Sequence, residues 1–428
     1  MSRSSIVSRI AHQTFLHTPS TMPQGLWWEH LESNFADRPE GFELEPRDWF
    51  RVNVAAGLDR VLRFYGGSLL TGTLPAGLLP EVGWDGLTFR ETPADWAVYR
   101  RAVLEGDPRS FFREPPEGVE VTTYDPRWGF FVPEDGTVEG LKFQSPYEPF
   151  HKGMQEAFDG YRNNRTARAR YWRHNDGPRP TLLAIHGFMA DPYWLNERFF
   201  SLQSFYEQGY DIALFTLPHH GLRAESGSFY SGQGFFSEGL SGVNEAMGQA
   251  ICDLRVFLRY LREERGVEKV GVTGVSLGGW TTALLASIDD NIEFAIPNVP
   301  VVSPVDLILE WPPAGLLIRA GLFLSQWSVK NMREVLAVTT PLTYQPRLDP
   351  ERLMIIGGVG DRLAPPKHSR LLWDHWGRCQ IHWFPGNHIL HLDRGDYLDH
   401  MSSFMEKLDF LGEPTVASGA RHLNSVPA

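Results

Sequence analysis

The pentapeptide G-V-S-L-G at residues 274–278 places the strongest constraint on the fold of this chain. It follows the apolar run 270–273, which is typical of a buried strand, and it precedes a helix-like stretch over residues 280–288. A serine on a sharp turn between a strand and a helix needs small neighbours, and the flanking glycines provide that space. The setting favours a strained turn that lifts the Ser276 hydroxyl clear of a sheet, where it can act as a nucleophile.

Two further polar residues follow strand-like runs later in the chain. Asp361 comes after the apolar run 353–360, and His388 comes after the run 381–384. In catalysis by a serine nucleophile, a histidine takes the hydroxyl proton and an acid holds the imidazole in the right tautomer. Ser276, Asp361 and His388 therefore supply the residue types that this chemistry needs.

A third motif, His186-Gly187-Phe188, follows the apolar run 181–185. Together with the serine turn and the chain order of serine, acid and histidine, it resembles the α/β-hydrolase superfamily, in its serine esterase and lipase-like members. The resemblance covers residues 138–411 and assigns no subfamily. It implies an α/β-hydrolase fold, with a mostly parallel central sheet flanked by helices, a mainly helical N-terminal region and a cap insertion.

The same resemblance implies what surrounds the three catalytic residues. The backbone N–H groups of Leu277 and Phe188 form the oxyanion hole, with the N–H of Met189 as an alternative to that of Phe188. A loop after the expected strand 210–217 carries two histidines, which either contact substrate or hold the loop in shape. The residues expected to line a substrate pocket are Met189, His219, His220 and Trp280.

Alternatives exist for the acid and for the base. Asp306 follows the strand-like segment 294–302 and is the alternative acid. His391 lies three residues after His388 and is the alternative base, because residues three apart share a face on a helical turn. His186 is interpreted as structural, since the histidine of this motif usually organises its loop in related folds.

Individual elements are also predicted by local patterns. Residues 165–172, 181–185 and 210–217 are expected as strands. Asp191 followed by a proline is expected to cap a helix that continues through Leu202. Alternation of strands and helices in this part of the chain favours a mostly parallel sheet.

The chain is expected to divide into several units. Residues 1–137 precede the first expected sheet strand and form a mainly helical N-terminal domain, either a lid over the site or a structural wing. Residues 138–412 form the catalytic domain, with a cap insertion at residues 304–348. Residues 413–428 form a short polar tail that is expected to be disordered.

Composition narrows the classes of partner. Of 428 residues, 42% are hydrophobic and 21% charged, which is ordinary for a soluble globular protein. A formal charge of −12 disfavours nonspecific binding to nucleic acid. Cys252 is expected as a free buried thiol, and the spacing of Cys252 and Cys379 indicates neither a disulfide framework nor a metal site. We expect no cofactor, no transmembrane segment and, because residues 1–28 lack a continuous apolar core, a cytoplasmic protein.

Four functions remain for a chain with these features. The first is a serine hydrolase that cleaves a small-molecule carboxylic ester. The second is an enzyme that cleaves a carbon–carbon bond next to a ketone with the same three residues, and the third is a serine amidase or peptidase. The fourth is a non-catalytic binding protein on this scaffold. Substrate identity and oligomeric state have no signature in the sequence.

Overall fold

The structure, a computed structural model, describes residues 26–40, 42, 44–71, 93–126, 131–325 and 327–412. The expected polar tail at residues 413–428 lies outside the described residues. Residues 1–25 also lie outside the described residues, and the predicted cytoplasmic location depends mainly on this segment.

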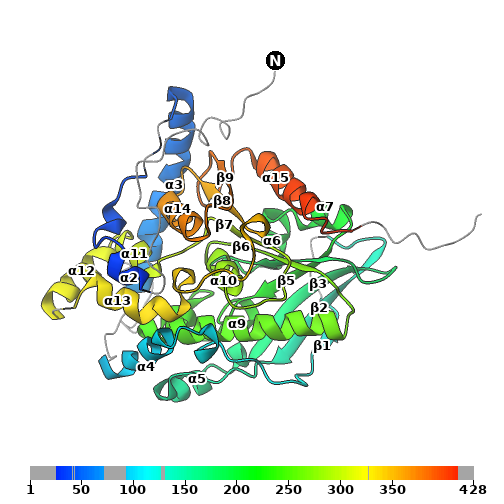
Figure 1. Cartoon of the computed structure of the whole chain (residues 1–428), viewed down its shortest axis with the longest axis horizontal. Helices are drawn as coiled ribbons and strands as arrows, with labels where there is room; N and C mark the ends of the chain where they lie inside the picture. Colours follow the sequence, from blue (N-terminus) through cyan, green and yellow to red (C-terminus); the bar gives the residue numbers. More distant parts are fainter. Residues whose placement is uncertain are drawn as a thin grey trace, which may run out of the picture.

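A nine-stranded sheet forms the centre of the molecule (Figure 1). The first three strands of the sheet are joined to one another and to β5 in antiparallel fashion, and all later neighbours are parallel. The predicted mostly parallel sheet is therefore confirmed. In spatial order the strands are β1 (Thr122–Tyr124), β2 (Gly136–Gln144), β3 (Thr166–His174), β5 (Asp211–Thr216), β4 (Thr181–Ile185), β6 (Val270–Val275), β7 (Ala295–Asn298), β8 (Met354–Gly358) and β9 (Gln380–Phe384).

Helices cover both faces of the sheet, because successive apolar side chains of a strand point to opposite sides. In β4, Leu183 belongs to the cluster that contains α9 (Gly239–Glu263) and α10 (Leu277–Leu285). The adjacent Leu182 belongs to the cluster that contains α7 (Leu202–Glu207) and α15 (Arg394–Lys407). The other α-helices include α2 (Trp27–His30), α3 (Pro46–Thr71), α4 (Pro93–Leu104), α5 (Gln155–Gly160), α6 (Tyr193–Phe199), α11 (Pro304–Leu309), α12 (Ala314–Ser325), α13 (Val329–Leu336) and α14 (Pro366–His375).

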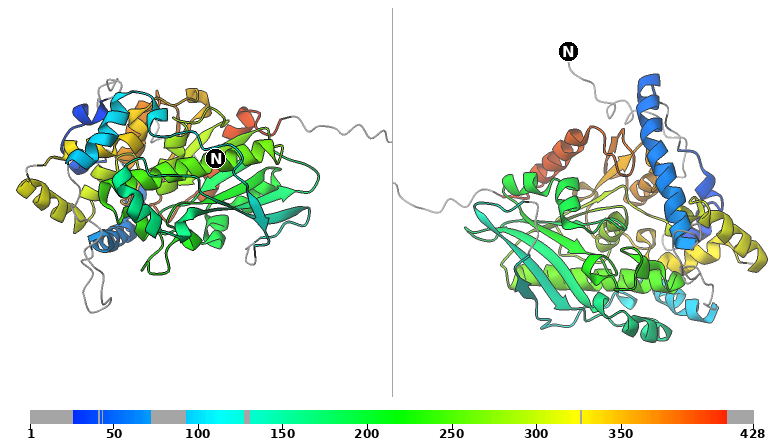
Figure 2. Two further views of the ribbon diagram at one scale, coloured as in Figure 1. Left: turned by 90° about the horizontal axis from the view of Figure 1, so that it is seen from below. Right: turned by 180° about the vertical axis from the view of Figure 1, so that it is seen from behind.

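The N-terminal helices lie beside the helices of the predicted cap. Figure 2 shows α3 as a long helix along one side of the molecule, next to α12. Helices α2 and α4 both contact α13. The described parts of residues 1–137 are thus packed on the same side as residues 304–348, although the division into domains remains a prediction.

Two elements differ from the sequence-based expectation. The helix expected to continue from Asp191 through Leu202 ends at Phe199, because Ser201 adopts a left-handed backbone with φ 52° that an α-helix cannot contain. Pro192 is the residue that precedes α6, while the Asp191 carboxylate accepts a hydrogen bond from the Ser231 hydroxyl. The sheet also begins before residue 138, since β1 pairs with β2 at its edge.

None of the helices in the described ranges is both long and apolar enough to cross a membrane.

Candidate active site

Ser276 lies on a strained turn between β6 and α10. Its backbone angles are φ 57° and ψ −112°, a conformation that a side chain with a Cβ rarely adopts. A Cβ on Gly274 would overlap the Gly278 carbonyl, and a Cβ on Gly278 would overlap the carbonyls of Ile185 and His186. Both glycines are therefore needed for the turn to pack against the neighbouring strand and helix, as the motif predicts.

Asp361 and His388 lie in contact at the ends of neighbouring strands. Asp361 follows β8, His388 follows β9, and the Asp361 Oδ2 atom is 2.7 Å from His388 Nδ1. The other carboxylate oxygen accepts the backbone N–H groups of Leu363 at 2.9 Å and Ala364 at 2.8 Å. Both side chains are buried. The carboxylate thus holds the imidazole with Nδ1 as the donor, which leaves Nε2 as the acceptor.

The sheet brings the serine to the same edge as this pair. The three residues follow the parallel strands β6, β8 and β9. Strand β7 lies between β6 and β8, and β8 is adjacent to β9. Carboxyl ends of parallel strands meet at one edge of a sheet, where ligands bind in open α/β folds. The order of the strands therefore groups the residues that the sequence predicted as a site.

Burial and charge act on His388 in opposite directions. Burial opposes the charged imidazolium, but the Asp361 carboxylate, its hydrogen bond and the Asp59 carboxylate together raise the pKa of His388 above its usual value. The environment of this histidine therefore favours the protonated form that a general base acquires during the reaction.

The two predicted oxyanion donors lie close to the serine turn. Leu277 is the first residue of α10, where the helix itself supplies no acceptor for the N–H group. A Cβ placed on Gly187 would be 3.4 Å from the Ser276 Cβ, so the loop that carries Phe188 passes beside the predicted nucleophile. Met189, the alternative donor, has φ 58° and is exposed over 42% of its surface.

Asp59 of α3 is a residue of this site that the sequence analysis missed. Its Oδ2 atom accepts the backbone N–H groups of Arg362 and His388, each at 2.9 Å. The signal that was available is an aspartate on the apolar face of a helix, since Asp59 follows Val52 and Ala55 at helical spacing and all three are buried. Its partners, however, lie about three hundred residues away in the sequence.

The alternative acid has a different partner. Asp306 of α11 forms a buried ion pair with Arg333 of α13, with Oδ1 2.6 Å from Nη2 and Oδ2 2.9 Å from Nε. The same guanidinium donates to the carbonyls of Leu31 and Glu32, and so joins the cap helices to the N-terminal segment. Asp306 is therefore placed to stabilise the fold.

Replacing Asp306 with alanine is expected to lower the free energy of unfolding by about 3–5 kcal/mol, because the Arg333 guanidinium would stay buried without its counter-ion. Urea unfolding followed by tryptophan fluorescence measures this change. The matched control is Glu29→Ala, which removes the partner of Lys330 in an exposed ion pair that also involves α13. It should cost less than about 1 kcal/mol, and equal losses in both variants would contradict the assignment.

The alternative base, His391, is turned toward aromatic residues. Its ring centroid lies 4.3 Å from that of Phe384 and 4.7 Å from that of Phe199, and its Nε2 atom is 3.3 Å from the His388 carbonyl. Burial, followed by the charge of His388, lowers the pKa of His391 to about 3. The structure thus brings His388, and not His391, to Asp361.

His186 and the two histidines after β5 lie in buried packing. His186 bonds to the carbonyl of Gly187 through Nδ1 and accepts the Leu217 N–H at Nε2, so it joins two loops. His219 contacts the Asn164 side chain through both its Nε2 atom and its backbone N–H, and the His220 ring bonds to the Pro218 carbonyl. Burial lowers the pKa of all three histidines, to about 3 for His219, so they are neutral.

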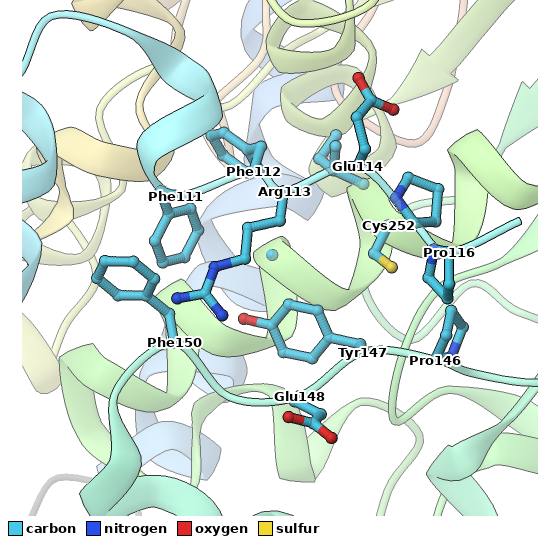
Figure 3. Close-up of a pocket in the computed structure, with 13 residues that line it drawn as sticks. Phe111, Phe112, Arg113, Glu114, Pro116, Pro146, Tyr147, Glu148, Phe150 and Cys252 are labelled. Carbon is cyan, nitrogen blue, oxygen red and sulfur yellow. The ribbon is translucent and has the colours of Figure 1, made fainter.

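The remaining pocket candidate, Trp280, is buried in α10 and donates to the Thr339 carbonyl. A cavity of about 160 Å³ with several aromatic residues in its lining lies elsewhere, against α9 (Figure 3). The described residues that line it include Tyr147, Phe150 and Cys252, and do not include the predicted serine, acid or histidine. This cavity is therefore separate from the predicted site around Ser276.

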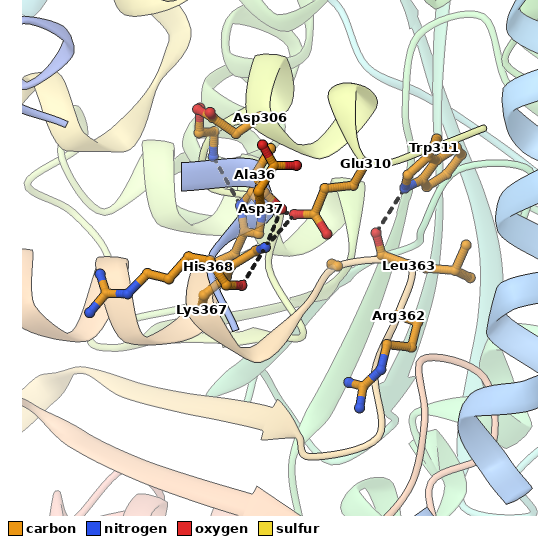
Figure 4. A network of polar contacts seen from close by, with 12 residues as sticks. Ala36, Asp37, Asp306, Glu310, Trp311, Arg362, Leu363, Lys367 and His368 are labelled. Carbon is orange, nitrogen blue, oxygen red and sulfur yellow. Dashed lines mark hydrogen bonds and ion pairs between the residues drawn. The ribbon is translucent and has the colours of Figure 1, made fainter. Parts of the chain in front are cut away.

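Residues of the predicted cap also contact the segment that follows Asp361. Figure 4 shows Trp311 donating to the Leu363 carbonyl at 3.1 Å, and Glu310 pairing with Lys367 at 2.9 Å. Lys367 also donates to the carbonyl of Ala36. The predicted cap and the N-terminal segment therefore both contact the segment that follows the predicted acid, Asp361.

Sequence comparisons find relatives of this chain whose names state no function. No family model matches. Over 288 residues the chain is 28% identical to uncharacterized protein Rv2627c of Mycobacterium tuberculosis strain H37Rv, and equally to uncharacterized protein MT2702 of strain CDC 1551. The match covers 66% of this chain and 66% of each relative, just under two thirds of their length.

Comparison with solved structures finds many similar folds. Acetyl xylan esterase 1 from Thermoanaerobacterium sp. JW/SL YS485 superposes with a TM-score of 0.50 and 16% identity, over 74% of this chain and 94% of the esterase. Acetyl xylan esterase from Paenibacillus sp. R4 superposes with a TM-score of 0.50 and 14% identity, over 79% and 98%. At these identities the likeness concerns the fold alone.

Proposed function

The chain has the α/β-hydrolase fold, and on that basis we propose that it is a serine hydrolase that cleaves a carboxylic ester through a covalent acyl-enzyme. The observation that carries the proposal is the strained turn of Ser276 at the sheet edge that also holds the Asp361–His388 contact. A serine hydroxyl is a weak nucleophile unless a neighbouring base removes its proton. Strained backbone conformations cluster at functional sites, and here the strained serine follows a strand at the same sheet edge as an oriented imidazole.

The proposed reaction has two halves. Ser276 Oγ attacks the acyl carbonyl while His388 Nε2 takes its proton, and Asp361 stabilises the imidazolium that forms. The N–H groups of Leu277 and Phe188 stabilise the oxyanion, each by about 3 kcal/mol. His388 then returns the proton to the leaving alcohol, and a water molecule, activated in the same way, releases the acid and regenerates Ser276.

Two other reactions use the same residues. Cleavage of a carbon–carbon bond next to a ketone and hydrolysis of an amide both begin with attack of Ser276 on a carbonyl. We place the ester first because the serine turn and the His-Gly motif resemble those of serine esterases, and because an ester has the better leaving group. The cytoplasmic location and the covering of the site by residues 1–137 remain predictions that accompany this proposal.

Labelling with a fluorophosphonate tests the function before any substrate is known. The wild-type protein should be labelled once per chain, on the tryptic peptide that contains Ser276, and should hydrolyse p-nitrophenyl esters. A panel of esters, anilides and β-diketones then separates the three reactions. An unlabelled, fully folded protein that turns over none of these compounds would contradict the proposal and leave the binding protein as the explanation.

A further inference from the structure

Helix α3 is docked against the loops that carry the predicted acid and base. Its contacts reach the segment after β8, the segment after β9 and the cap, so one helix touches three separate parts of the chain. They comprise Val52 packed with Val359 and Trp383, the Asn387 side chain donating to the Ala55 carbonyl, Arg51 paired with Asp393 at 3.0 Å, and Arg63 paired with Glu310 at 2.8 Å.

Asp59 lies at the centre of this contact and has no exposed surface. A single oxygen, Oδ2, accepts two backbone N–H groups at 2.9 Å, one from Arg362 and one from His388. Arg362 directly follows Asp361, so the Asp59 carboxylate ties the loop of the acid to the loop of the base. The other oxygen, Oδ1, is buried with no hydrogen-bond partner among the described residues.

The charges that face Asp59 are those of the catalytic pair. Asp361 and His388 act on it directly, while Arg362 faces it with its backbone N–H and turns its guanidinium toward the carbonyls of Val359 and Asp361. Of the other arginines on α3, Arg51 pairs with Asp393 and Arg63 pairs with Glu310, while Arg60, which directly follows Asp59, is exposed. Burial and repulsion from Asp361 raise the pKa of Asp59 to about 6, although His388 and the two N–H donors act in the opposite direction.

We propose that Asp59 is a positioning residue for the Asp361–His388 pair: it joins their loops through two hydrogen bonds, and its negative charge stabilises the His388 imidazolium. The N-terminal helix is then part of the catalytic apparatus even though Asp59 touches neither substrate nor serine. The kinetic part of this inference rests on the proposed hydrolase function. The contacts, and the charge on His388, do not depend on it.

A purely structural clamp does not explain the choice of a carboxylate. A neutral asparagine oxygen can accept the same two N–H groups, without the cost of burying a charge beside Asp361. A carboxyl whose pKa is raised in the folded state contributes stability that is fully present below its unfolded pKa. That contribution is lost as the pH rises through about 6. The charged form therefore opposes folding at neutral pH, and its benefit must lie in what it does to His388.

The test compares three variants of the full chain. Asp59→Asn removes the charge and keeps an acceptor, whereas Asp59→Ala removes both. Asp48→Asn changes a partly exposed acidic residue of the same helix and is the control. Three quantities are measured: the midpoint at which the downfield proton resonance of His388 Nδ1 titrates, kcat and KM for a p-nitrophenyl ester, and the melting temperature between pH 4 and pH 8.

Asp59→Asn should move the titration midpoint of His388 down by about one pH unit. It should lower kcat about three- to tenfold with KM unchanged. The difference in melting temperature between Asp59→Asn and wild type should increase from pH 4 to pH 8. Wild type loses the stability that the raised pKa of Asp59 contributes as the pH rises through about 6, whereas asparagine does not titrate. Asp59→Ala should lower kcat further, and Asp48→Asn should match wild type in all three measurements.

A wild-type midpoint for His388 in Asp59→Asn would overturn the inference, whether or not Asp59→Ala folds. So would a variant that loses stability equally at every pH and keeps wild-type kcat, since that is the behaviour of a structural clamp. The resonance of His388 is read without substrate. A protein that lacks hydrolase activity but shows the predicted midpoint shift would therefore contradict the proposed function and leave the role of Asp59 intact.

Discussion

Replacing Ser276 with alanine is expected to lower the turnover of a p-nitrophenyl ester by about 10⁴- to 10⁶-fold and to abolish labelling by a fluorophosphonate. The loss is this large because no acyl-enzyme can form, while the remaining acid, base and oxyanion donors have no nucleophile to assist. Alanine fits the turn as well as serine does, since the side chain of Ser276 caps no backbone group of α10. The variant should therefore fold, and kcat/KM compared at equal protein concentration measures the effect.

The control for this experiment is Ser287→Ala. Ser287 lies just beyond α10 and donates to the Ala283 carbonyl within the same turn, so its loss should leave kcat/KM within about twofold of wild type. Undiminished labelling of Ser276→Ala at another serine would show that the nucleophile lies elsewhere.

The local part of this site was predictable because it depends on neighbouring residues. An apolar run, two glycines and a serine specify a strained turn without reference to the rest of the chain. Asp361 and His388 were predictable for a related reason. Each directly follows an apolar run, and parallel strands place their carboxyl ends together whatever their separation in sequence.

Asp59 shows what the sequence could not reveal. Its function depends on two backbone N–H groups in loops far along the chain, and nothing beside Asp59 in the sequence indicates those partners. The strand β1 was missed for the same reason, since three residues become a strand only by pairing with β2. The break at Ser201 was missed because Pro192, Phe199 and Leu202 are all compatible with one continuous helix.

The second large effect on turnover is expected from a change in Asp361, the first of the two candidate acids. Asp361→Asn is expected to lower kcat by about 10⁴-fold while the protein still folds. The amide oxygen can keep the N–H groups of Leu363 and Ala364, but its NH₂ group then faces His388 and favours the wrong imidazole tautomer. Steady-state kinetics with an activated ester, together with urea unfolding, separates the loss of turnover from a loss of stability.

The pH dependence gives this prediction a direction as well as a size. In wild type the general base is neutral only above the raised pKa of His388, so the acid limb of kcat/KM should lie above the usual value for histidine. Asp361 is the largest of the influences that raise this pKa. Its removal should therefore move the acid limb of the residual activity to lower pH, which a change in folding alone would not do.

Two variants serve as controls, because each removes a rejected alternative. His391→Ala should keep most of the turnover, since His391 packs between aromatic rings and its neutral imidazole has no carboxylate partner in the described part of the chain. Asp306→Asn should weaken the fold through Arg333, yet leave the kcat of the folded fraction close to wild type. If Asp306→Asn were the variant that lost 10⁴-fold in kcat and Asp361→Asn were mild, the 2.7 Å contact between Asp361 and His388 would not be the catalytic one. The acid would then have to come from α11.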